Sequence, residues 1–165
     1  MKLKSLILLA LAMLLLTVPV YATTGTITGT IARFSASQWS PPAVELVLTC
    51  TADITAHTYP VTIINDLSGI SSYDLRGMRL HSIKTIPGTT GPTDDTDVTI
   101  TDKYGIDLLG GKGTNAIDNA TTNWIVFGYS TYVIEPLITG NITITITNNA
   151  VNSAVVTVVI ELVGP

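Results

Sequence analysis

The sequence has few charged residues and very few residues that bind metals or form disulfides. Only 12% of its 165 residues are charged, with eight Lys and Arg against twelve Asp and Glu. The net charge of −4 argues against nucleic-acid binding, which needs clustered positive charge. Two His and one Cys are too few for a zinc cluster or a disulfide framework. Coiled-coil heptads, a Gly-X-Y period and recognised catalytic motifs are also missing from the sequence.

The first 22 residues have the pattern of a secretory signal peptide. Lys2 and Lys4 precede an almost wholly apolar stretch over residues 5–18. Pro19 follows, and then Val20-Tyr21-Ala22, with small or β-branched residues at the positions that a signal peptidase reads. We expect cleavage after Ala22, which would export the chain and limit its membrane contact to the signal before cleavage. The alternative is an uncleaved anchor, although the apolar stretch is shorter than the roughly 20 residues that span a bilayer.

Residues 23–165 are predicted to form one all-β domain, an antiparallel β-sandwich of the jelly-roll or immunoglobulin-like type. Apolar β-branched residues alternate with Thr, most clearly over residues 141–147, where Ile142, Ile144 and Ile146 would face a core. Turn residues separate such segments at the spacing of a sandwich or barrel. Eight or nine strands are expected, near residues 25–35, 43–52, 57–65, 73–86, 97–102, 106–109, 123–134, 140–147 and 153–163.

The last predicted strand is apolar on both faces, unlike the others. Val155, Val159 and Val163 occupy one face, and the residues that alternate with them occupy the other. This composition is typical of a central strand buried on both sides, and also of a strand that lies against a neighbouring subunit. Val155, Val159 and Val163 are therefore predicted to contact another copy or a lattice, with cover from inside the domain as the alternative.

The single cysteine, Cys50, falls in the predicted strand over residues 43–52. It shares one face of that strand with Val44, Leu46 and Leu48, as the period of two requires. We expect a buried thiol that behaves as a small hydrophobic side chain. An intermolecular disulfide is the alternative for an unpaired cysteine in an exported chain.

The densest acidic stretch contains Asp94, Asp95 and Asp97. Calcium binds several carboxylate and carbonyl oxygens, so these residues are weak candidates for a Ca²⁺ site. Their spacing does not match an EF-hand loop, and turns in which Asp side chains accept hydrogen bonds from backbone N–H groups are the alternative. No other cofactor is expected.

The remaining candidates for chemistry do not meet the tests for an active site. Residues 109–114 resemble a phosphate-binding loop, but Ile106 stands where its first Gly should be and Gly113 where Ser or Thr should be. Glycines that adopt positive φ in a loop are the simpler interpretation. His57 and His81 lie apart with no local signature of a triad, so we expect no enzymatic activity.

Four aromatic residues could line a sugar-binding face, although core packing is the commoner role of such side chains. They are Trp39, Trp124, Tyr129 and Tyr132. A glycan is therefore a possible ligand of the domain.

Two segments of the sequence carry a resemblance to a known family. One is the loop-rich stretch over residues 86–115. The other is the segment rich in Thr and Ile over residues 139–150, together with the Val-rich strand after it. This pattern resembles small, largely uncharacterised β-proteins encoded among the virion genes of tailed bacteriophages, over roughly residues 73–163. The resemblance implies a head-decoration or fibre-associated subunit at the virion surface, with no catalytic residues to transfer. The signal peptide departs from that pattern, because capsid components assemble in the cytoplasm.

Two functions therefore remain as expectations. The first is a non-enzymatic structural or accessory subunit of a phage particle, which acts by packing and self-association. The second is an exported cell-surface or filament module with a β-sandwich fold, with a glycan as a possible ligand. Gene neighbours separate them, since the first predicts virion genes nearby and the second predicts secretion or filament genes.

Overall fold

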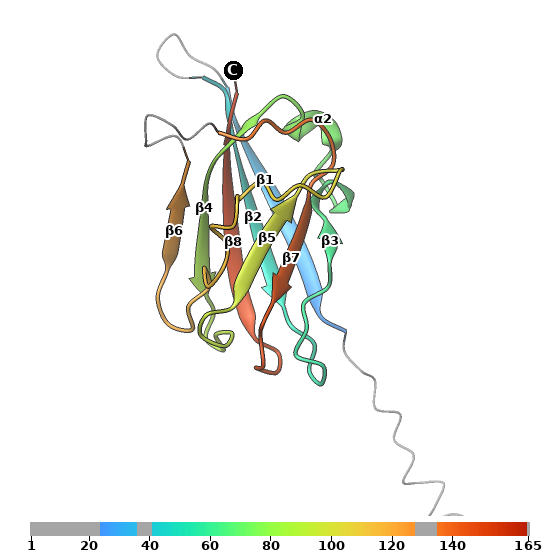
Figure 1. Ribbon diagram of the computed structural model, residues 1–165. Coiled ribbons are helices and arrows are strands. Elements are labelled where there is room, and N and C mark those ends of the chain that lie inside the picture. The colour runs from blue at the N-terminus through green and yellow to red at the C-terminus, as the bar shows by residue number, and fades with distance from the viewer. Residues whose placement is uncertain (1–23, 36–40, 128–134, 165) are drawn as a thin grey trace, which may run out of the picture.

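Two antiparallel β-sheets face each other across one hydrophobic core in the computed structural model (Figure 1). The structure describes residues 24–35, 41–127 and 135–164. The predicted all-β sandwich is confirmed, since these residues form eight strands and only two single-turn helices. Within the same residues, no helix is long and apolar enough to cross a membrane. The predicted signal over residues 1–22 lies outside them.

One sheet has five strands in the order β1-β2-β8-β4-β6, and the other has three in the order β3-β7-β5. The strands are β1 (Thr26–Phe34), β2 (Ala43–Thr51), β3 (Thr62–Ile63), β4 (Arg79–Pro87), β5 (Asp97–Thr101), β6 (Asn123–Val126), β7 (Thr143–Thr147) and β8 (Val155–Val163). The helical turns are η1 (Ile64–Asp66) and α2 (Ser72–Leu75).

The alternation in the sequence places the core as predicted. Ile142, Ile144 and Ile146 are buried at β7, and the Thr residues between them are half-buried or exposed. In β2, Leu46, Leu48 and Cys50 have no exposed surface. Burial raises the pKa of the Cys50 thiol to about 12, so this residue is the inert buried thiol that the sequence predicts.

The strand β8 is central in the large sheet, as one of the two interpretations of its composition predicts. It pairs with β2 on one side and with β4 on the other over nearly its whole length. Its even-numbered residues point into the core, where Ile160 lies between Leu46 of β2 and Ile83 of β4, all nearly inaccessible to solvent. Burial of each such aliphatic side chain contributes about 1.5–3 kcal/mol to folding.

Three strand predictions were wrong in part, and side-chain hydrogen bonds to the backbone explain each difference. The strand expected over 57–65 begins only at Thr62. Asp53 accepts the N–H groups of residues 55 and 56 in the turn just before it, and His57 extends this reversal with a positive φ of 60°. The strand expected to start at residue 73 is preceded by α2, which a capping box between Ser71 and Asp74 initiates. These local bonds compete with strand pairing.

The third difference lies over residues 106–109, where the sequence predicts a strand. The chain does reverse after β5, with Gly105 N–H bonded to the Asp102 carbonyl at 3.0 Å, but only one bridge, between Thr101 and Asp107, continues the pairing. Asp107 instead accepts the N–H groups of Leu109 at 2.9 Å and Gly111 at 2.7 Å. The segment is therefore a series of turns. The part of the predicted strand over 128–134 falls outside the described residues.

Candidate functional site

The predicted interface residues Val155, Val159 and Val163 lie in the middle of the outer face of the five-stranded sheet. We call this surface, formed by the side chains that point away from the core, the outer face. Val159 is only 8% exposed because Val47 and Lys84 flank it in the neighbouring strands. Val155 and Val163 are half-buried. The second sheet covers the opposite face. The burial of Val159 therefore comes from neighbours within its own sheet, whereas Val155 also lies against Gly88 in the loop after β4.

Large apolar side chains are exposed around these valines on the same face. Phe34 of β1 is 55% exposed, Ile86 of β4 is 38% exposed, and Trp124 of β6 is 60% exposed. The strand register places all three on the outer face. Lys84 lies over the Trp124 ring, with its Nζ atom 5.2 Å from the ring centre. A valine-centred face with exposed aromatic side chains at both sides is typical of a contact surface.

Five polar residues form two hydrogen-bonded groups on and beside the outer face. Glu161 accepts hydrogen bonds from Ser82 Oγ at 2.5 Å and Lys84 Nζ at 2.7 Å. A β-bulge between Leu80 and Ser82 interrupts the register there, and His81 Nδ1 lies 2.8 Å from Glu135 Oε1. Because Ser82 and His81 contact different carboxylates, they do not form a nucleophile–base pair. The arrangement fastens β4 to β8 and to the segment at residue 135.

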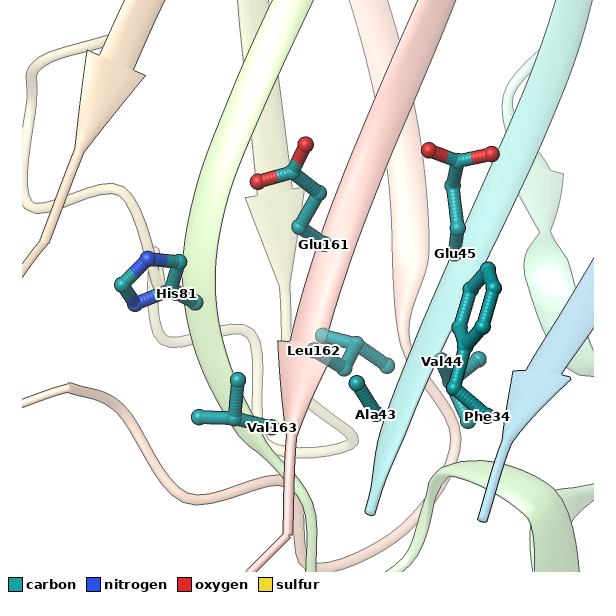
Figure 2. A pocket seen from close by; sticks show the side chains of 8 residues that line it. All are labelled: Phe34, Ala43, Val44, Glu45, His81, Glu161, Leu162 and Val163. Atoms are coloured by element: carbon teal, nitrogen blue, oxygen red, sulfur yellow. The ribbon is translucent and has the colours of Figure 1, made fainter. Parts of the chain in front are cut away.

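A shallow groove of about 200 Å³ opens on the outer face between Phe34 and His81 (Figure 2). Val163 and Ala43 contribute apolar surface to it, and Glu161 contributes a carboxylate. Glu45 also lines the groove and lies opposite Glu161 in the strand pairing, so two carboxylates are neighbours there. Such a groove fits an apolar side chain of a partner better than it fits a small polar substrate.

The contacts of Glu161 predict a pH-dependent contribution to stability. Lys84 and Ser82 lower the pKa of Glu161 below its ordinary value of 4.5. A lowered folded-state pKa stabilises the protein above pH 4.5 and ceases to do so as the pH falls through the folded-state value. We therefore expect Glu161→Gln to reduce the free energy of unfolding by about 1 kcal/mol at pH 7, and by less near pH 3.

Urea unfolding at several pH values measures this effect. Glu45→Gln is the matched control, because it removes a like charge opposite Glu161 and should leave stability unchanged or slightly higher. A loss that is equal at pH 7 and pH 3 would contradict an ionic contribution from Glu161.

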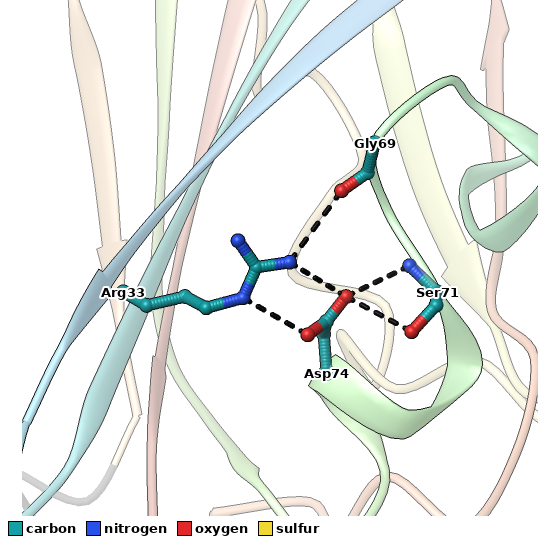
Figure 3. Close-up of polar contacts among 4 residues, drawn as sticks. All are labelled: Arg33, Gly69, Ser71 and Asp74. Atoms are coloured by element: carbon teal, nitrogen blue, oxygen red, sulfur yellow. Dashed lines mark hydrogen bonds and ion pairs between the residues drawn. The ribbon is translucent and has the colours of Figure 1, made fainter.

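An ion pair joins the far end of β1 to α2 (Figure 3). Arg33 Nε donates to Asp74 Oδ1 at 2.9 Å, and Arg33 Nη2 lies 2.8 Å from Asp74 Oδ2. The backbone N–H and hydroxyl of Ser71 also donate to Asp74, at 2.9 and 3.0 Å. The guanidinium and these donors hold the pKa of Asp74 well below its usual range. The bidentate pair fixes the direction of the Arg33 side chain.

The candidate calcium residues lie at the start of β5. Asp94 and Asp95 are exposed, while Asp97 accepts hydrogen bonds from the backbone N–H of Asn115 at 2.7 Å and from the side chain of Asn148 at 2.5 Å. In the described part of the chain, no three His, Cys, Asp or Glu side chains group in a way that could hold a metal ion. A calcium site at these residues stays an untested prediction.

The glycine-rich loop after β5 does not have the structure of a phosphate loop. Gly110 and Gly111 adopt positive φ, 60° and 79°, as the simpler interpretation predicts. Gly113 has a different role, because its carbonyl accepts the Val98 N–H at 2.9 Å and the two backbones lie in close contact. The loop thus covers the open side of β5.

Of the four aromatic residues considered for a sugar-binding face, only Trp124 lies in the described part of the chain. Trp39, Tyr129 and Tyr132 fall outside it. The groups around Ser82 and Glu161 were not predicted from the sequence, because their partners are 79 residues apart and only strand pairing brings them together.

Comparison with known proteins adds no function to this geometry. No protein-family model matches the sequence, and no curated protein or solved structure is significantly similar to it.

Proposed function

We propose that the protein is a non-enzymatic structural subunit that works by packing its outer face against copies of itself. The observation that supports this proposal is the row of valines on the central strand β8, surrounded by exposed Phe34, Ile86 and Trp124. An apolar face of this kind loses unfavourable contact with water when a second surface covers it.

The setting proposed for this subunit is the surface of a phage particle, as a decoration or fibre-associated protein in a capsid lattice. The resemblance over residues 73–163 supports this setting. The alternative is an exported cell-surface or filament module, which the secretory pattern over residues 1–22 supports. Both settings use the same outer face, and in the exported module Trp124 is the residue proposed to contact a glycan.

The double substitution Val155→Thr and Val159→Thr tests the packing function. Threonine has nearly the same shape as valine but carries a hydroxyl, so it weakens an apolar contact without removing volume. We expect the variant to stay folded and to lose its oligomer in light scattering at a concentration at which the wild type is associated. The wild-type protein and a Thr147→Ala variant, changed at an exposed position of the other sheet, are the controls.

Two outcomes count against this function. A variant that loses thermal stability while its mass stays unchanged would show that these valines are covered within one molecule. A wild-type protein that is monomeric at high concentration and does not bind particles would favour the exported binding module.

A further inference from the structure

The strand β1 has one side that pairs with nothing in the described part of the chain. It ends the large sheet and pairs only with β2, over all nine residues from Thr26 to Phe34. The backbone N–H and C=O groups on its other side therefore form an open edge. The open side of β5, by contrast, is bonded to the loop at Gly113, and β3 and β6 have only two and four residues.

The open edge of β1 lacks the features by which proteins usually prevent strand pairing. Those features are short length, bulges, prolines and charged side chains, especially lysine. The register with β2 is unbroken, and the strand contains no proline. Between Thr26 and Ala32, the residues of β1 that are exposed on the outer face have small side chains. The one charged residue of the strand, Arg33, is bound to Asp74 of α2 (Figure 3).

We propose that β1 pairs antiparallel with β1 of a second copy, with the two-fold axis at Thr30. A two-fold axis at this position places Thr26 opposite Phe34 and Thr28 opposite Ala32 of the other copy, and Thr30 opposite itself. All nine residues of both strands are then paired, which an axis at any other residue does not achieve. The axis also keeps the core sides of both copies on the same side of one continuous sheet.

A second copy fits this edge better than a charged partner does, because pairing two copies brings no like charges close together. In the proposed register each Arg33 lies opposite Ile27 of the other copy. The two Arg33 Cα atoms are then six residues apart along the strands, or about 20 Å. This distance exceeds the Debye length of about 8 Å at physiological salt, and each guanidinium is already paired with Asp74.

The pairing goes beyond the packing of the outer face and does not depend on it. The β1 edge and the valines of β8 are different surfaces of the sheet, separated by β2. If both contacts form, each with its own two-fold axis, they link copies into a closed ring or an extended array.

Single cysteines at two positions of β1 test the pairing and its register. Residues opposite each other in antiparallel strands have Cβ atoms about 5 Å apart, within reach of a disulfide. Thr30→Cys in the full-length protein should therefore give a covalent dimer on mild oxidation. Thr26→Cys is the matched control, because the proposed register separates the two copies of residue 26 by about 27 Å. The native Cys50 is fully buried and does not compete.

A charge substitution supplies the second measurement. Thr30→Lys places two lysines opposite each other at the axis and should raise the dimer dissociation constant roughly fivefold or more, measured by analytical ultracentrifugation. Thr147→Lys makes the same change at an exposed position of β7 and should leave the constant unchanged. The expected result is that Val155→Thr with Val159→Thr does not abolish the Thr30→Cys dimer, which separates this pairing from the outer-face contact.

Three results would overturn the proposal. One is equal cross-linking of the Thr26→Cys and Thr30→Cys proteins, which would indicate random collision. Another is a wild-type protein that stays monomeric together with a Thr30→Cys thiol that is protected from labelling, which would indicate that the chain covers its own edge. The last is a dimer that Thr30→Lys leaves as stable as the wild type.

Discussion

Replacing Gly113 with alanine is expected to reduce the free energy of unfolding by about 3 kcal/mol. A Cβ atom at this position would overlap the carbonyl oxygen of Val98 and lie 2.8 Å from a methyl group of Leu109. The Val98 oxygen belongs to β5 and cannot move without disturbing the pairing of β5 with β7. The cost is therefore one of steric overlap between backbones.

Gly110→Ala is the matched control for this prediction. Gly110 has a φ of 60°, but nothing lies within 4 Å of the position that a Cβ atom would take. Alanine there costs only the left-handed conformation, about 1 kcal/mol. Urea unfolding of both variants gives the two values. Equal losses of unfolding free energy would contradict the close approach of Gly113 to Val98. They would indicate that glycine is needed in this loop only for its backbone conformation.

The strands of this fold that follow from the sequence are those whose two faces differ in their surroundings. Ile142, Ile144 and Ile146 alternate with Thr because one face of β7 meets the core and the other does not. The same logic correctly placed Cys50 on the buried face of β2. Period-two alternation shows which face of a strand is buried, because alternate side chains along a strand lie on the same face.

The parts that the sequence did not predict depend on contacts between distant residues or on single side chains. The open edge of β1 depends on strand order, which alternation does not encode. Asp53 and Asp107 accept backbone N–H groups and form turns where strands were expected, and alternation of apolar residues does not reveal which Asp will do so. The two-sided apolar pattern of β8 predicted a central strand and an interface equally well, because both surround a strand with apolar groups.

Replacing Ile160 with alanine is expected to reduce the free energy of unfolding by about 2–5 kcal/mol. Ile160 is fully buried, and its partners Leu46 and Ile83 on either side lie at the centre of the large sheet. These neighbours are held by their own strand pairing, so they cannot move enough to fill the space that the lost methyl groups leave. Since single domains are stable by only about 5–15 kcal/mol, the milder Ile160→Val variant, expected to cost about 1 kcal/mol, guards against complete unfolding.

Val163→Ala in the same strand is the control that connects this prediction to function. Val163 is half-buried on the outer face, so its truncation should cost the unassociated protein less than Ile160→Ala does. In contrast, Ile160→Val should leave the mass of the folded oligomer unchanged, because its side chain points away from the proposed contact. If Val163→Ala costs as much as Ile160→Ala at a concentration where the protein is monomeric, the outer face must be covered within one molecule, and the proposed packing function loses its surface.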